Sequence, residues 1–146
     1  MDPTGNPNHP ALLRKAATEA TQARYRGKVF DWRTGATCVH MARYHLRQLG
    51  RRPPTLPRLR SALAAKRARQ RRGSPDVGDM LDGIGLQRIA PAQMLLGDLA
   101  VGPADEFFGA IGVCAGPLKL LGWREDAPGL VILDVDLSQL TGAWRV

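Results

Sequence analysis

The sequence has 146 residues, of which 44% are hydrophobic, and its formal net charge is +8 at pH 7. This length and apolar content predict one soluble domain with a single hydrophobic core. No stretch approaches the ~18 uninterrupted apolar residues of a membrane span, so we expect none. The two cysteines, Cys38 and Cys114, exclude a disulfide framework and lack the paired spacing of a zinc site. We therefore expect free thiols, synthesis in a reducing cytoplasm, and neither a metal nor a cofactor.

The charge is distributed unevenly along the chain. Residues 1–72 contain 17 Lys or Arg and 3 Asp or Glu, whereas residues 73–146 contain 4 and 10. Such polarity suits a domain whose basic half docks on an acidic neighbour. Nucleic-acid binding is the alternative for a basic half.

Residues 1–10 (MDPTGNPNHP) have neither a cationic patch nor an apolar run, which predicts a flexible leader and no signal peptide. A single domain then covers residues 11–146. Its first helix is expected over residues 11–26. The apolar stripe of this helix consists of Leu12, Ala16, Ala20 and Ala23.

The best-defined helix begins near Ala36–Thr37 and ends at Leu49. Gly50 is suited to a left-handed cap, and Pro53–Pro54 forbid continuation of the helix. Cys38 is expected in the first turn, facing the core. The face that it shares, at helical spacing, consists of Cys38, Ala42, Leu46 and Leu49.

Residues 55–72 predict a third helix whose end (KRARQRR) is continuously basic, and residues 76–86 predict a short one. From Gly97 onward the pattern becomes extended, with turn residues between the candidate strands. The expected strands are Asp98–Val101, Ala110–Ala115, Lys119–Trp123, Leu130–Val135 and Ala143–Val146. N-terminal helices followed by a C-terminal antiparallel β-meander predict the α+β class.

Several short motifs occur in a fixed order along almost the whole chain. They are FDWRTGATC at residues 30–38, Gly50, RIAPA at 88–92 leading to GDL at 97–99, GAIGV at 109–113, GLV at 129–131 and AWRV at 143–146. With these motifs, and with a cysteine at the start of a helix, the chain resembles a family of phage tail-assembly proteins related to the NlpC-type, papain-like cell-wall cysteine peptidases. The resemblance implies a papain-like fold with Cys38 at the nucleophile position.

The sequence departs from the pattern of the active peptidases at two positions. The residue before the nucleophile is an Asp in the family and is Thr37 here. The general-base histidine of the active enzymes opens the second strand, and the resemblance puts Ala110 at that place. Because alanine cannot accept a thiol proton, the resemblance implies a catalytically degenerate scaffold.

The three histidines offer no evident substitute for that base. His40 lies about 200° around the helix from Cys38, and His45 lies roughly 10 Å along the helix axis from it. His9 belongs to the leader. An imidazole normally activates a catalytic thiol, so Cys38 is a candidate catalytic residue that we expect to be vestigial. The structural interpretation of Cys38 is a small apolar core residue.

Other residues have both a structural and a functional interpretation. Cys114 is expected in the core, and Asp98 is a turn-capping carboxylate or a substrate contact. Trp32 and Trp144 are core-edge residues or anchors for a partner. The basic run Lys66–Arg72 has no interleaved aromatic residues, which favours a docking surface over nucleic-acid binding.

The expected function is therefore a structural component of the distal tail of a tailed phage, at the tail tip, hub or baseplate. We expect other tail proteins as partners, and multiple copies in the virion. An active cysteine hydrolase of peptidoglycan peptides that uses Cys38 is the first alternative. A basic nucleic-acid-binding module is the second.

Overall fold

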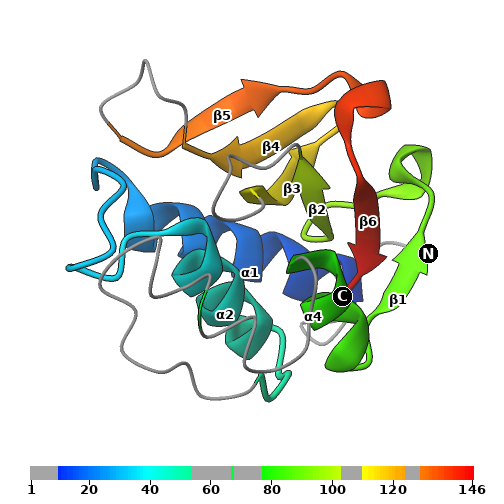
Figure 1. The fold of residues 1–146 in the computed structure, drawn as a ribbon, viewed down its shortest axis with the longest axis horizontal. Helices are drawn as coiled ribbons and strands as arrows, with labels where there is room; N and C mark the ends of the chain where they lie inside the picture. The colour runs from blue at the N-terminus through cyan, green and yellow to red at the C-terminus, as the bar shows by residue number, and fades with distance from the viewer. Residues whose placement is uncertain (1–9, 54–66, 68–76, 103–109, 124–128) are drawn as a thin grey trace.

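The computed structural model describes residues 10–53, 67, 77–102, 110–123 and 129–146. These residues form an α+β domain in which helices α1 (Pro10–Tyr25) and α2 (Cys38–Gln48) lie against one face of an antiparallel sheet (Figure 1). The short helix α4 (Val77–Gly83) lies beside the sheet edge that contains β1 and β6. No helix in the described ranges is long and apolar enough to cross a membrane.

The sheet has six strands in the order β1-β6-β2-β3-β4-β5. Their bounds are β1 Gln87–Ile89, β2 Leu99–Gly102, β3 Ala110–Gly116, β4 Lys119–Gly122, β5 Val131–Asp134 and β6 Gly142–Arg145. Strands β2 to β5 form the predicted meander. The last strand, β6, returns across the sheet to pair with β2 and also pairs with β1. All five predicted strands are confirmed to within about two residues, whereas β1 was not predicted.

The ends of α2 lie where the sequence predicts them. Thr37 is the N-cap residue, and its side chain accepts a hydrogen bond from the backbone N–H of His40 at 3.3 Å. Leu49 is the C-cap residue, and Gly50 follows with a φ of +77°, a left-handed conformation that glycine adopts at little cost. The predicted short helix is confirmed as α4. The predicted third helix lies outside the described residues except for Arg67, which is helical and exposed.

The predicted buried stripe of α1 is wrong. Leu12 and Ala20 are half-buried and Ala16 and Ala23 are exposed. The residues buried instead are Ala17, Thr18, Thr21 and Tyr25. The Thr18 hydroxyl donates a hydrogen bond to the Arg14 carbonyl one turn earlier, and the Thr21 hydroxyl shares its one proton between the Ala17 carbonyl and His45 Nδ1. Because these bonds satisfy the hydroxyls inside the helix, threonine can occupy a core-facing position at little cost.

The main core lies between the helices and the sheet. Successive side chains of a strand point to opposite faces of the sheet, so every second strand residue belongs to this core. Leu99, Val101, Val113, Leu121 and Trp144 face the helices and are nearly inaccessible to solvent. The intervening residues Ala100, Cys114 and Leu120 form a second, smaller cluster. This assignment follows the two-residue repeat of extended strands. It also confirms Cys114 and Trp144 as core residues.

Asp98, immediately before β2, is completely buried and joins three segments of the chain. Its carboxylate accepts a hydrogen bond from Arg14 Nη1 in α1 at 2.7 Å, and others from the backbone N–H groups of Leu95 and Val146 at 2.8 and 3.1 Å. Arg145 Nε lies 3.0 Å from Asp98 Oδ2 without the alignment of a hydrogen bond, so this contact is electrostatic. The turn-capping interpretation of Asp98 is confirmed, and its second role as a buried ion-pair centre was not predicted.

His45 makes a second link between the layers. Its imidazole is completely buried, with Nε2 at 2.7 Å from the Gly97 carbonyl and Nδ1 at 2.9 Å from the Thr21 hydroxyl. A carbonyl oxygen can only accept a hydrogen bond, so Nε2 carries the proton, and Nδ1 accepts from the Thr21 hydroxyl, which shares its one proton with the Ala17 carbonyl. Burial lowers the pKa of His45, an effect that its hydrogen bond to Gly97 and the nearby Asp98 partly oppose and Arg14 reinforces. The side chain therefore ties α2 to α1 and to the turn before β2 in its neutral form.

The first prediction concerns Asp98. Asp98→Asn leaves Arg14 buried opposite a neutral amide, and should lower the free energy of unfolding by about 3–5 kcal/mol in urea titrations. The matched control is Asp134→Asn, because Asp134 pairs with Lys119 on the surface. An exposed pair contributes about 0–1 kcal/mol. Equal losses in the two variants would contradict the central role of Asp98.

The second prediction is a pH dependence that His45 imposes. Its pKa is lower in the folded than in the unfolded chain, where it is about 6.5, so the unfolded chain binds more protons below that pH. The stabilisation by His45 is complete above about pH 6.5 and falls as the pH drops toward the folded pKa. His45→Leu should lower the free energy of unfolding by about 1–3 kcal/mol at neutral pH. The difference in free energy of unfolding between this variant and the native chain should become smaller below about pH 6.5. A difference that does not change with pH would contradict a buried His45 that is neutral in the folded chain.

Candidate functional site beside Cys38

Cys38 is the first residue of α2, directly after the N-cap Thr37. Its side chain is partly buried and packs against the main core, so the prediction that it faces inward in the first turn is confirmed. Helix α2 packs on β3, the strand that Ala110 opens opposite Gly102 of β2. The structure thus places the helix of Cys38 against the strand that begins at Ala110. Thr37 is completely buried, with its hydroxyl 2.7 Å from His40 Nδ1.

The two described histidines are held by partners of their own. Both ring nitrogens of His45 are occupied, by Thr21 and by Gly97, so this imidazole cannot take a proton from Cys38. His40 has its Nδ1 beside Thr37, and its ring lies edge-on to Trp32 with a centroid distance of 6.3 Å. Burial, and then the charge of Arg43, lower the pKa of His40. His9 lies outside the described residues.

A continuous row of aromatic rings runs from α2 across the end of α1 to the loop before Cys38. Successive rings meet edge to face at centroid distances of 5.7 to 5.9 Å, a geometry that aromatic quadrupoles favour. The rings, in spatial order, are Tyr44, Tyr25, Trp123, Phe30 and Trp32. The row joins residues that are far apart in the sequence, and it was not predicted. Trp32 belongs to this row as a partly buried core-edge residue.

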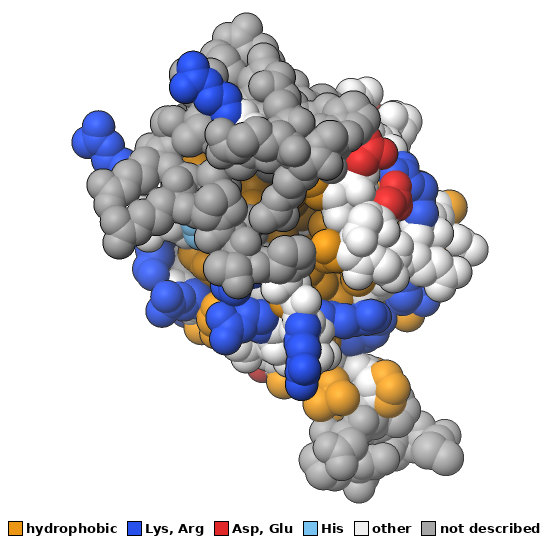
Figure 2. Space-filling view, turned by 60° about the horizontal axis from the view of Figure 1, so that its bottom comes forward, with side chains coloured by type: hydrophobic (Ala, Val, Ile, Leu, Met, Phe, Trp, Pro, Cys, Tyr) orange, Lys and Arg blue, Asp and Glu red, His pale blue; other side chains and the backbone are white. Residues whose placement is uncertain are grey.

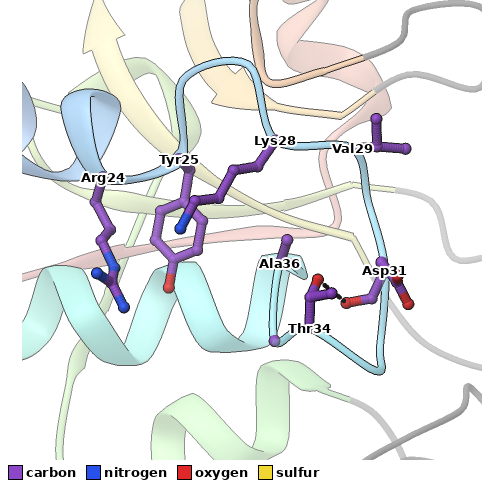
Figure 3. A pocket seen from close by; sticks show the side chains of 8 residues that line it. Arg24, Tyr25, Lys28, Val29, Asp31, Thr34 and Ala36 are labelled. Atoms are coloured by element: carbon purple, nitrogen blue, oxygen red, sulfur yellow. Dashed lines mark hydrogen bonds between the residues drawn. The ribbon is translucent and has the colours of Figure 1, made fainter.

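A cavity of about 370 Å³ opens at one side of the row, between the C-terminal end of α1 and the loop before α2. Figure 3 shows Arg24, Tyr25 and Lys28 on one side of it, and Asp31 and Thr34 on the other. Arg24 lies over the ring of Tyr44 and Lys28 over the ring of Tyr25, at 5.8 and 5.6 Å. Burial raises the pKa of Tyr25, and Arg24 opposes that rise. The cavity is therefore cationic and aromatic on the side of α1.

The loop that forms the other side is held in a tight turn. Asp31 and Ala36 form an isolated antiparallel bridge with two backbone hydrogen bonds, and Asp31 Oδ1 accepts a third from the backbone N–H of Arg33 at 2.8 Å. Gly35 adopts a φ of +76°, which favours glycine. Trp123 donates its indole N–H to the Lys28 carbonyl at 2.9 Å and so fixes the start of the loop.

The helical layer of the domain is strongly basic. Residues 10–53 contain ten Lys or Arg and two Asp or Glu. Both acidic residues are engaged within the layer, Glu19 with Lys15 and Asp31 in its turn. Figure 2 shows Lys and Arg side chains spread over this face, with acidic side chains near one edge of the view. The exposed cations include Arg24, Arg26, Lys28, Arg33, Arg47, Arg51 and Arg52.

No metal-binding group is found among the residues that the structure describes, since nowhere do three or more His, Cys, Asp or Glu side chains converge. Asp98, the one completely buried carboxylate in those ranges, is engaged by Arg14, Arg145 and two backbone N–H groups. Its alternative interpretation as a substrate contact therefore has no support in the geometry. The arrangement offers a thiol at a helix start, a cationic aromatic cavity beside it and a basic face.

Comparison with known proteins identifies the family but no function. No curated protein matches the chain. A model of a domain of unknown function, DUF6950, matches residues 13–146, which include the helices and strands described above from the first turn of α1 to the end of β6. The chain therefore belongs to the DUF6950 family of domains of unknown function.

Proposed function

We propose that this protein is a structural component of the distal tail of a tailed phage, built on an NlpC-type, papain-like scaffold that has lost its catalytic pair. The observation that carries the proposal is the environment of Cys38. A thiol lies at the start of a helix packed on a sheet, as in the cysteine peptidases that the motifs resemble, while the strand facing that helix opens with Ala110. Virion localisation and several copies per tail are part of the same proposal.

The state of the histidines argues against catalysis. A cysteine nucleophile needs a base that takes the thiol proton and later returns it to the leaving amine. His45 is committed to Thr21 and Gly97, and His40 is held at Thr37. A helix N-terminus can favour a thiolate, but it cannot protonate a leaving group. General acid–base catalysis usually contributes at least about 10²-fold to a rate, so its loss leaves a poor hydrolase.

The docking role is supported by the basic helical layer. A layer with ten cations and two internally engaged carboxylates attracts acidic protein surfaces and orients their approach. The described aromatic residues of this layer pack edge to face against one another, an arrangement that differs from the open stacking platforms of single-strand-binding proteins. We therefore favour tail proteins over nucleic acid as partners.

A functioning cysteine hydrolase is the second candidate, because Cys38 follows by two residues Ala36, which lines a cavity that could admit a peptide. Alkylation of Cys38 at different pH values separates the two candidates, in a Cys114→Ala background that leaves one thiol. Without a base, the rate should rise about tenfold per pH unit from about pH 6 to about pH 8, as for an ordinary thiol. A rate that is already maximal near pH 6 would indicate an activated thiolate and favour the enzyme.

Infectivity tests the docking role directly. A phage that carries Arg47→Glu and Arg51→Glu should assemble fewer complete tail tips, because the two substitutions reverse charge on the exposed basic layer. Cys38→Ala in the same gene should leave tails and infectivity unchanged. The measurements are plaque titre and electron microscopy of purified virions. Loss of infectivity in the Cys38 variant alone, with normal tails, would reverse the proposal in favour of catalysis.

A further inference from the structure

We propose that the cavity at the end of α1 binds an acidic peptide segment of a protein partner, with a carboxylate placed between Arg24 and Lys28 and an apolar neighbour against the aromatic row. The inference deepens the docking role proposed above, since it names the chemistry of the contact. It goes beyond general charge attraction because it assigns the contact to one cavity and to two particular cations.

The two cations are placed for a ligand. Arg24 and Lys28 both line the cavity, one from the last turn of α1 and one from the turn that follows it. Both are exposed, and among the described residues neither forms an ion pair. Each lies over a tyrosine ring, which restricts the position of its charge without neutralising it. A carboxylate that enters between them gains two opposite charges in a partly desolvated site.

The apolar part of the site lies beside these cations. Phe30 and Val29 remain 40% and 61% exposed although the ring of Phe30 also contacts Trp32 and Trp123. Large exposed apolar side chains next to a cavity are typical of contact sites. A volume of about 370 Å³ falls within the range of ligand cavities, about 300–1,000 Å³. It suits a few side chains of a peptide.

Asp31 is the feature that distinguishes a peptide from a phosphate ligand. It lines the same cavity as the two cations, and its Oδ1 accepts from the Arg33 N–H. The carboxylate of Asp31 repels a ligand with several phosphate charges more strongly than it repels a ligand with one carboxylate. It can also accept hydrogen bonds from backbone N–H groups, which a peptide supplies and a phosphate chain does not. The combination therefore favours an acidic peptide.

The test uses the complete protein and two terminally blocked pentapeptides, Gly-Glu-Phe-Glu-Gly and Gly-Gln-Phe-Gln-Gly, followed by two-dimensional NMR. The acidic peptide should give saturable shifts of the indole N–H of Trp123, which bonds Lys28, and leave that of Trp144, which bonds Asp82. The glutamine peptide should bind at least about tenfold more weakly, because it lacks both charges.

Matched variants separate the cavity from the general charge of the layer. Arg24→Gln with Lys28→Gln should weaken acidic-peptide binding by about tenfold or more, whereas Lys15→Gln with Arg52→Gln removes the same charge from exposed positions outside the cavity lining and should change binding less than about twofold. Equal effects of the two pairs would overturn the inference and leave only a diffuse basic surface. Binding of a single-stranded oligonucleotide at the same site, tighter than the acidic peptide, would overturn it in favour of phosphate. Either result would refute the assignment of the contact to this cavity, whereas the infectivity and microscopy test of the docking role is independent of it.

Discussion

The buried carboxylate of Asp98 is the constraint on which the rest of the structure depends. A charge without solvent is tolerated only where opposite charge and hydrogen-bond donors surround it, and here these come from α1, from the turn before β2 and from the end of β6. Because Arg14 must reach Asp98, the face of α1 that contacts the sheet is determined. Tyr25, eleven residues further along that helix, is thereby held in the core between Tyr44 and Trp123 of the aromatic row.

That constraint also bears on the chemistry around Cys38. His45 lies beside the same turn and is bound to Gly97, the residue before Asp98, and to Thr21 of α1. This imidazole is thus part of the link between the two layers. What remains accessible is a cationic, aromatic cavity and a basic helical face. We therefore propose that the function depends on this surface rather than on the thiol.

Local signals made a large part of this fold predictable. Thr37 and Gly50 mark the ends of α2, and turn residues separate the strands of the meander. What could not be predicted depends on distant partners. Strand β1 is three residues long and exists through its pairing with β6, more than fifty residues away. The threonines of α1 are buried because their hydroxyls bond within the helix, and the aromatic row joins rings from four separate segments. Likewise Cys38 was recognisable at a helix start, whereas the cavity beside it was not.

Imaging the virion by electron cryo-microscopy tests the central claim most directly. We expect density for this chain at the distal end of the tail, in copies related by the tail symmetry, with α1 and α2 facing an acidic neighbour and a side chain of that neighbour between Arg24 and Lys28. A complete tail tip that lacks the chain would contradict the account. So would a chain attached only through the β5 edge of the sheet, with its basic layer facing solvent.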